Sequence, residues 1–440
     1  MKRAAVVIVG LLAGGLAQPG FAQPGPAPAA PRQAVPVAPK QLAPAAPKRS
    51  APAAPKQATP ADAKQCPSAI GFERWLDGVK RDAMAQGVSQ ATLAAAAPHL
   101  VFDQSIIRRD RGQSVFQQSF LQFSDRMVST NRMQNGARAL KNHAALFQRI
   151  EEKFGVPGPV LAAFWGLETD FGTNVGKMSV LRSVTTLAFD CRRPEFFRPQ
   201  VIDALRVLQR GDLTIDEMMG DWAGEVGPMQ FTPSDYFKYG VDFDGNGRRD
   251  LRTVPDALAS SANMLMNAGW KRGEPWLQEV RVPANMPWDQ ADIRIQHPRS
   301  QWVQWGVRSV HGAALPADEL QASLMLPMGR HGPAFLAYPN FQGYLKWNQA
   351  MVYALTAAYY ATRLAGAPPV SRTGANIVML TTPQLAELQR LLVKVGYKGT
   401  ADGKLGLETR ASIKVAQQRL GMPPDSFPTA DLIERLRTMR

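Results

Sequence analysis

The chain of 440 residues carries 51 lysines and arginines against 36 aspartates and glutamates, so its formal net charge is +15 at pH 7. This length suffices for two or three domains, and the charge favours acidic partners without bearing on the fold. Zinc peptidases or amidases and serine hydrolases are excluded, because the five histidines lack metal-ligand spacing and no Gly-x-Ser-x-Gly motif occurs. These histidines are His99, His143, His297, His311 and His331.

The N-terminus predicts a signal peptide over residues 1–22. It begins with the basic "MKR", continues with the apolar run "AAVVIVGLLAGGLA" and ends in the small residues "GFA". The run is too short to span a bilayer comfortably, although an uncleaved anchor is the alternative. We therefore expect a periplasmic protein with no membrane span after cleavage. Nucleic acid is then excluded as a partner, and polyanionic envelope material is favoured.

Residues 23–65 are almost entirely Pro, Ala, Gln and Lys, with "APK" repeated at intervals of eight residues. Such a composition cannot bury a core, so an extended linker is predicted. Cys66 and Cys191, the only cysteines, follow this segment. In an exported protein they could form a disulfide that stabilises the fold by about 3–5 kcal/mol. Two separate buried thiols are the alternative.

From Gly71 onward, apolar residues recur at helical spacing. Helices are predicted over 72–87, 139–154, 157–172, 199–210, 255–269 and 348–364. Strand-like alternation is confined mainly to 277–282 and 302–310. We therefore expect one large, mainly α domain over 66–366. A linker over 367–380 and a small helical domain over 381–440 follow it.

The stretch "AAFWGLETDFGTNVG", residues 162–176, places Glu168 beside an apolar stripe of a helix that begins at Pro157 or Pro159. A carboxyl among aromatic rings should have a raised pKa, because its ionised form is poorly solvated. It could then remain protonated near neutral pH and donate a proton to a leaving oxygen. Gly172, one turn further on, would leave room for a substrate. The alternative is an ordinary glutamate at a helix edge, reaching solvent or an arginine.

A second stretch, "GDWAGEVGPMQFTPSDY" at 220–236, combines glycines, aromatic residues and the amide of Gln230. Aromatic faces pack against sugar rings and amides bond to hydroxyl or acetamido groups, so a loop lining a groove is predicted. A glycine-rich connector with buried aromatics is the alternative.

Together the two stretches resemble the lytic murein transglycosylase B family. The resemblance covers about 70–366 and includes the continuation "FKYGVDFDGNGRRDL" and the later segment "NFQGYLKWNQAMVYALTAAYYATRLAG". The resemblance implies a lysozyme-like α domain that cleaves the MurNAc–GlcNAc β-1,4 bond of peptidoglycan. It assigns Glu168 as the single catalytic residue, acting first as acid on the glycosidic oxygen and then as base on the muramoyl C6 hydroxyl. The product is a 1,6-anhydro end. Ordinary glycosidases need a second carboxylate, and no cofactor is required for this chemistry.

The resemblance also suggests substrate-binding residues: Asp221, Gln230, Asn263, Trp347 and Asn348. Asp221 stands where the family often has serine, so it could bring a second carboxylate near Glu168, raise its pKa further and permit hydrolysis. Alternatively, Asp221 points at a nearby arginine. Asn263 is followed by methionine instead of the family's tyrosine, while Trp347 and Asn348 keep an aromatic platform and an amide.

The segment "DFDGNGRRDLRT", which starts at Asp242, matches the first half of an EF-hand loop. The twelfth position is Thr253 in place of glutamate, and a later aspartate could close a longer loop, as in the family. The predicted site for structural Ca²⁺ consists of Asp242, Asp244, Asn246, Arg248 and Asp256. An Asx-rich turn without metal is the alternative.

The segment from 381 onward resembles the helical peptidoglycan-binding domain that is appended to many wall hydrolases. Its role would be to hold the enzyme on the insoluble polymer. Peptidoglycan glycan strands are accordingly the expected partner. Three hypotheses remain: a lytic transglycosylase, a lysozyme-type hydrolase that uses Asp221 or Glu225 as partner carboxylate, and a non-catalytic wall-binding scaffold.

Overall fold

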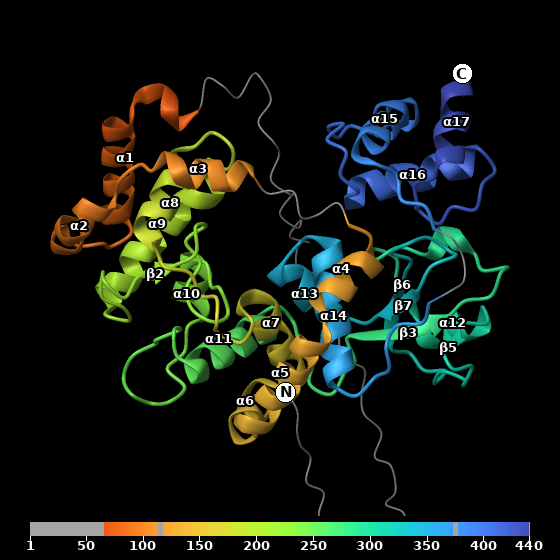
Figure 1. Cartoon of the computed structure of the whole chain (residues 1–440), viewed down its shortest axis with the longest axis horizontal. Coiled ribbons are helices and arrows are strands. Elements are labelled where there is room, and N and C mark those ends of the chain that lie inside the picture. Colours follow the sequence, from red (N-terminus) through yellow and green to blue (C-terminus); the bar gives the residue numbers. More distant parts are fainter. Residues whose placement is uncertain (1–65, 113–117, 373–376, 440) are drawn as a thin grey trace, which may run out of the picture. The chain divides into compact units, whose positions relative to one another are not determined.

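The computed structural model describes residues 66–112, 118–372 and 377–439. Helices dominate these ranges, which confirms the predicted mainly α fold (Figure 1). The predicted signal peptide over 1–22 and the linker over 23–65 lie outside the described residues. In the ranges that are described, we find no helix with the length and apolar character that a bilayer crossing requires.

The larger part of the described chain begins with helices that precede the sheet. Their bounds, with those of one small ladder, are α1 (Phe72–Ala85), α2 (Gln90–Ala96), α3 (Gln104–Arg111), α4 (Phe120–Met127), α5 (Thr130–Asn142), α6 (Ala144–Phe154), α7 (Gly158–Thr169), β1 (Met178–Ser179), α8 (Val180–Phe189), α9 (Pro194–Arg210), β2 (Met219–Gly220), α10 (Pro233–Tyr239) and α11 (Val254–Asn267). Helix α9 packs against α1, α8 and α10, so it organises the first part of the chain.

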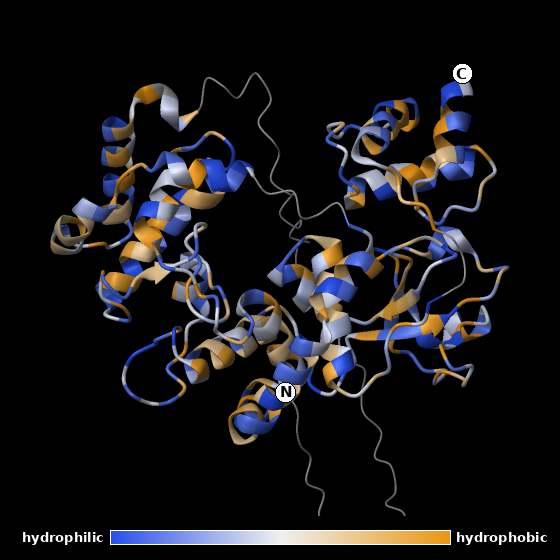
Figure 2. Ribbon diagram, in the orientation of Figure 1, coloured by the Kyte–Doolittle hydropathy of each residue, from blue (hydrophilic) through white to orange (hydrophobic). Residues whose placement is uncertain are grey.

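Helix α1 shows how the surface helices follow their sequence pattern. Its ribbon alternates between hydrophilic and hydrophobic residues (Figure 2), and it buries Trp75, Leu76, Val79 and Ala83 on one face. The helix ends at Ala85, and Gly87 follows with φ of 87°. The helix predicted over 72–87 is thereby confirmed.

Helix α7 occupies the interior. It packs against α5, α6, α11 and the later helix α14 (Met351–Leu364), and from Val160 to Thr169 every residue except Glu168 is buried. A helix that is apolar on all sides belongs in a core. Pro157 is its N-cap and Pro159 lies in its first turn, where proline is well tolerated.

Several of the predicted helices have different bounds in the structure. Helix α9 begins at Pro194, five residues before the predicted start, and α7 ends at Thr169, three residues before the predicted end. The segment 139–154 is divided at His143 between α5 and α6. The helix predicted from 348 begins only at Met351 and follows the short helix α13 (Phe341–Trp347), because Asn348 is extended and its side-chain oxygen accepts the N–H of Ala350.

A five-stranded antiparallel sheet lies between α11 and α13 in the chain. Its strands and helix are β3 (Leu277–Arg281), β4 (His297–Pro298), α12 (Arg299–Gln304), β5 (Arg308–Ser309), β6 (Gln321–Met325) and β7 (Ala334–Ala337). The strand order is β4-β6-β7-β3-β5, and Leu277 pairs with Ala337 in the central ladder. A separate apolar core on this sheet gathers around Trp302.

The strand predicted over 302–310 is wrong for its first half. Residues through Gln304 belong to α12, and only Arg308–Ser309 forms β5. The helix turns Trp302 fully into the core, where its indole N–H donates to the carbonyl oxygen of Ala322 at 3.0 Å. This buried contact favours the helix more than the alternation of apolar and polar residues favours a strand. Strand β3 agrees with the strand predicted over 277–282.

The C-terminal segment folds as a small helical bundle of α15 (Thr382–Leu392), α16 (Leu407–Arg419) and α17 (Ala430–Thr438) around its own core. It contacts the sheet region through α16. The Lys414 ammonium donates to the carbonyl oxygens of Asp289 and Ala291 at 2.8 and 3.0 Å, and the Arg410 guanidinium donates to the carbonyl oxygen of Pro327 at 2.9 Å.

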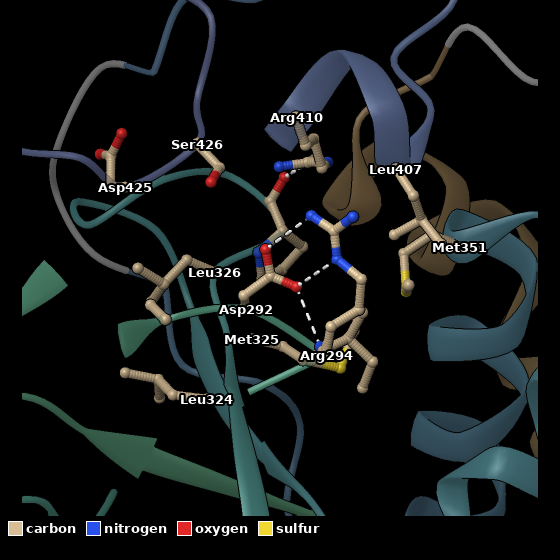
Figure 3. Close-up of a pocket in the computed structure, with 13 residues that line it drawn as sticks. Asp292, Arg294, Leu324, Met325, Leu326, Met351, Leu407, Arg410, Asp425 and Ser426 are labelled. Atoms are coloured by element: carbon tan, nitrogen blue, oxygen red, sulfur yellow. Dashed lines mark hydrogen bonds and ion pairs between the residues drawn. The ribbon is translucent and has the colours of Figure 1, made fainter. Parts of the chain in front are cut away.

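Figure 3 shows the small pocket at this contact, where Arg294 pairs with Asp292. It contains no residue of 162–176 or 220–236, so it is not the candidate site.

Candidate active site

Glu168 is the one residue near the end of α7 whose side chain keeps an accessible surface. Its carboxylate oxygen Oε1 accepts two hydrogen bonds, from the Trp347 indole N–H at 2.8 Å and from the Tyr353 hydroxyl. Trp347 ends α13 and Tyr353 lies in the first turn of α14, so three helices fix this carboxyl. Both hydrogen bonds go to Oε1, and among the described residues no donor bonds to Oε2.

Aromatic stacking holds Trp347 in place. Its ring lies over that of Phe164, with centroids 4.2 Å apart and planes inclined by 22°. Trp347 was expected as a platform for sugar; the structure shows that its N–H is bonded to Glu168. Tyr353 was missed by the sequence reasoning, because in "NQAMVYALTAAYY" it reads as one more core residue of a helix.

The surroundings of Glu168 disfavour its ionised form. Burial among protein atoms raises the pKa of Glu168 above its ordinary value, and the negative charge of Asp221 raises it further. The hydrogen bonds from Tyr353 and Trp347 act in the opposite direction but do not cancel the effect of burial. The protonated form of Glu168, which a general acid needs, is thus favoured relative to that of an exposed glutamate.

The backbone after Glu168 is bent by an unusual run of left-handed residues. Asp170, Phe171 and Gly172 have φ values of 49°, 60° and 85°, which costs energy at the two non-glycine positions. An ion pair between Arg132 and Asp170 at 2.6 Å holds the bend. At Gly172 an added Cβ would meet Trp165 and Pro228 at 3.7 and 3.8 Å, so this glycine serves the backbone conformation and does not clear open space.

Thr169 joins the two stretches that the sequence singled out. Its hydroxyl donates to the carbonyl oxygen of Pro228 at 2.7 Å and accepts the N–H of Gly172 at 2.9 Å. The ladder of β1 with β2 adds a second link, and Gly176 must be glycine because its Cβ would lie 2.2 Å from the carbonyl oxygen of Gly220. The two stretches therefore form one site.

Asp221 is placed near Glu168 and is not paired with an arginine among the described residues, contrary to that alternative. Its Oδ1 accepts the backbone N–H groups of Ala223 and Glu225 at 2.8 and 2.9 Å. Burial raises the pKa of Asp221, while these backbone bonds oppose the rise. The pKa of Glu225 is raised well above its ordinary value, first by burial and then by the charges of Asp221 and Glu168.

The three predicted amides already have partners inside the protein. The amide nitrogen of Gln230 donates to the carbonyl oxygen of Gly227 at 2.8 Å, and that of Asn263 donates to that of Tyr239 at 2.9 Å. Asn348 accepts the backbone N–H of Ala350 at 2.9 Å. These contacts fix the loops around the site; they do not by themselves define sugar contacts.

Three of the five predicted metal residues lie close together after α10. One carboxylate oxygen from each of Asp242, Asp244 and Asp256 lies within 4.8 Å of the others. This all-oxygen donor set fits the preference of Ca²⁺. The guanidinium of Arg248 turns to Glu217, with an N–O distance of 2.7 Å, and the Asn246 side-chain oxygen accepts the N–H of Arg248 at 2.9 Å.

A disulfide joins Cys66 to Cys191, with Cα atoms 5.1 Å apart. It ties the segment before α1 to the loop between α8 and α9. Free cysteines are absent from the described part of the chain.

Comparison with known proteins finds two family matches along the chain. The model of the transglycosylase SLT domain matches residues 71–362, and that of a peptidoglycan binding domain matches 381–436. Membrane-bound lytic murein transglycosylase B of Escherichia coli K12 is 27% identical over 282 residues, which cover 63% of this chain and 76% of the relative.

Among solved structures, SltB3 from Pseudomonas aeruginosa in complex with NAG-anhNAM-pentapeptide is 38% identical, with a TM-score of 0.76. The match covers 83% of this chain and 99% of that one. The lytic transglycosylase Slt35 of Escherichia coli, in a complex with calcium, has the same fold at 24% identity and a TM-score of 0.56, over 65% of this chain and 91% of that one. The chain therefore belongs to the transglycosylase SLT domain family.

Proposed function

We propose that Glu168 performs both proton transfers by which this chain, a peptidoglycan lytic transglycosylase, cleaves the MurNAc–GlcNAc β-1,4 bond. The observation that carries the proposal is the Glu168 carboxyl itself, which is desolvated, is only half-buried as a residue and accepts both of its hydrogen bonds at Oε1. Because Oε1 accepts two hydrogen bonds, the transferable proton resides on Oε2, the oxygen that faces a substrate.

In the first step Oε2–H protonates the glycosidic oxygen as the C1–O bond breaks. The resulting carboxylate then takes the proton of the muramoyl C6 hydroxyl while that oxygen bonds to C1 of the same sugar. The products are a 1,6-anhydromuramoyl end and a free 4-hydroxyl, and Glu168 is protonated again. Tyr353 and Trp347 stabilise the carboxylate between the two steps.

The experiment is a digest of purified sacculi followed by mass spectrometry of the products. Wild-type enzyme should give anhydro ends, and Glu168→Gln should bind sacculi without releasing fragments. Turnover by Glu168→Gln at the wild-type rate would refute the assignment. Reducing muramic acid as the main product would instead support the lysozyme-type hydrolase, with Asp221 as the partner carboxylate.

Trp347 and the loop over 220–236 are assigned to the glycan groove, with Asp221, Gln230, Asn263 and Asn348 along it. The proximity of Trp347 and Asp221 to Glu168 supports this assignment for two of the five residues. Replacement of each amide by alanine should raise KM more than it lowers kcat.

Asp242, Asp244 and Asp256 are proposed to hold a structural Ca²⁺, with Asn246 and Arg248 in the same loop. The clustering of the three carboxylates supports this site. The ion would stabilise the loop between α10 and α11 and take no part in the chemistry.

The remaining assignments concern location. We propose that residues 1–22 direct export to the periplasm and that residues 23–65 form a linker. The proposed order continues with a catalytic domain over 66–366, a second linker over 367–380 and a wall-binding domain over 381–440. The family matches over 71–362 and 381–436 support the last three boundaries. A fusion of residues 381–440 to a fluorescent protein should co-sediment with sacculi if the C-terminal domain targets the wall.

A further inference from the structure

A second tyrosine of α14, Tyr360, lies two turns after Tyr353, whose hydroxyl bonds to Glu168. Seven residues of α-helix advance about 10 Å and return to nearly the same face, so both side chains leave α14 on one side. Helix α14 packs against α5 and α7 (Figure 1). Tyr360 is fully buried, so it cannot contact substrate. Any part that it has in the reaction must come from its contacts with these helices.

The ring of Tyr360 occupies a notch between two glycines on the neighbouring helices. A Cβ atom added to Gly166 of α7 would lie 3.0 Å from Cε1 of Tyr360, and one added to Gly136 of α5 would lie 2.9 Å from its hydroxyl oxygen. Both distances are shorter than ordinary contacts between heavy atoms, which are about 3.5–4.0 Å. A side chain at either glycine would therefore displace Tyr360 or the helix that carries it.

The hydroxyl of Tyr360 is also linked to the end of α7. It donates to the carbonyl oxygen of Arg132 on α5 at 2.5 Å. The Arg132 side chain is only 14% exposed, and its Nε donates to the carboxylate of Asp170 at 2.7 Å. Asp170 is the left-handed residue at which α7 ends. Tyr360 therefore contacts α7 two residues before Glu168 and is linked to it two residues after Glu168.

These contacts fix α14 against α7 at the place where the hydrogen bond from Tyr353 to Glu168 forms. Tyr353 does not fix this arrangement by itself, because its hydroxyl has a single hydrogen-bond partner among the described residues, Oε1 of Glu168. A hydrogen bond weakens steeply when its length or angle is disturbed. A small shift of α14 would therefore weaken the bond to the catalytic carboxyl.

We propose that Tyr360 is a positioning residue that holds α14 where the Tyr353 hydroxyl reaches Oε1 of Glu168. The inference rests on the proposed function, since this bond matters to the reaction only if Glu168 transfers the proton. Tyr360 acts through Tyr353 and not on the substrate. A change in the notch then lowers kcat and leaves KM nearly unchanged.

The test measures kcat and KM on soluble glycan strands, first for Gly136→Ala. Alanine is the better helix former, so the substitution does not weaken α5 itself. The new methyl group presses on the Tyr360 hydroxyl and on Cδ2 of Leu364, which is the end of a side chain that can rotate. A misplacement of about 1 Å can cost about 100-fold in rate, so a shift of about half that size should lower kcat about tenfold.

Tyr360→Phe provides the rescue. It removes the oxygen on which the new methyl group presses, while its ring stays in the notch. Alone it should lower kcat about threefold, because the bond to the Arg132 carbonyl is lost. Combined with Gly136→Ala, it should bring kcat back to within about twofold of the value for Tyr360→Phe alone. In a Tyr353→Phe background, neither substitution should lower kcat by more than about twofold, because the bond that both disturb is already absent.

Gly78→Ala is the matched control. Gly78 lies inside α1, and an added Cβ would meet nothing closer than the Arg198 guanidinium, at 3.6 Å. This variant should keep the kcat of wild type. Urea unfolding shows which variants are folded, and Tyr360→Phe, which deletes a single oxygen, carries the comparison with the Tyr353→Phe background if Gly136→Ala does not fold.

Equal losses of kcat with and without the Tyr353 hydroxyl would overturn the proposal, because a purely structural effect is independent of that bond. An unchanged kcat in Gly136→Ala, a rise in KM in place of the fall in kcat, or a double variant no better than Gly136→Ala would overturn it as well. Full activity of Glu168→Gln would refute the proposed function instead.

Discussion

Thr169→Val tests how much the hydroxyl of Thr169 contributes to holding the two stretches of the site together. Thr169 is 1% exposed, and valine matches its shape. The change removes the hydrogen bond to the Pro228 carbonyl at 2.7 Å and the one from the Gly172 N–H at 2.9 Å. Each of the two backbone groups left without a partner costs about 1–3 kcal/mol, so the free energy of unfolding should fall by about 2–6 kcal/mol.

The control is Thr185→Val. Thr185 is a fully buried threonine of α8 whose hydroxyl has no hydrogen-bond partner among the residues that the structure describes. Its replacement should leave stability unchanged or raise it, because an unsatisfied polar group is removed. Urea unfolding followed by circular dichroism gives both values, and turnover of sacculi shows whether the catalytic carboxyl is displaced. Equal effects of the two substitutions, or a loss below about 1 kcal/mol for Thr169→Val, would refute the reasoning.

Three further predictions follow from the site. Burial raises the pKa of Glu168, so the contribution of this group to stability is fully present at low pH and is lost as pH rises through its folded-state pKa. Glu168→Gln should therefore raise the melting temperature more at pH 8 than at pH 5. An equal gain at both pH values would contradict this. Tyr353→Phe removes a hydrogen bond that lowers the pKa of Glu168, so the alkaline limb of the pH profile of kcat/KM should move to higher pH. The control Tyr359→Phe, on the same helix, should not move this limb. Chelation of Ca²⁺ should lower the melting temperature of wild type but not of Asp242→Asn, and an equal drop in both would remove the proposed metal site.

The sequence was sufficient for the helix that carries Glu168. Its apolar residues, its prolines at the start and its position next to glycines are local properties. The partners of the carboxyl were not predictable in the same way. Trp347 and Tyr353 lie 179 and 185 residues away, and local pattern does not show which face of α14 meets α7. The sequence also did not predict that Thr169 bonds to the second stretch, because the hydroxyl of a buried threonine in a helix normally bonds to the preceding turn of the same helix.

The sheet was harder to predict from the sequence for a different reason. Strands β6 and β7 have almost every residue buried, so they lack the alternation that marks a half-exposed strand. Short apolar runs of this kind are ambiguous between strand and helix. The segment 302–310 does alternate, but the packing of Trp302 against Ala322 decided its conformation.

Asp221 offers the sharpest test of whether Glu168 acts without a second carboxylate. Burial and the neighbouring carboxylates raise the pKa of Glu225 well above its ordinary value and disfavour its ionised form, so Asp221 is the stronger candidate for a hydrolytic base. In Asp221→Asn the side-chain oxygen can still accept the N–H groups of Ala223 and Glu225, so the turn survives while the charge disappears.

We expect Asp221→Asn to give the same anhydro products as wild type, because the muramoyl C6 hydroxyl and not water is the nucleophile. Removal of the like charge lowers the pKa of Glu168, so the alkaline limb of the kcat/KM profile should move to lower pH. Mass spectrometry of the digests and a pH–rate profile measure the two effects independently. If wild type released reducing muramic acid and Asp221→Asn did not, Asp221 would be the base of a hydrolytic branch and Glu168 would not work alone.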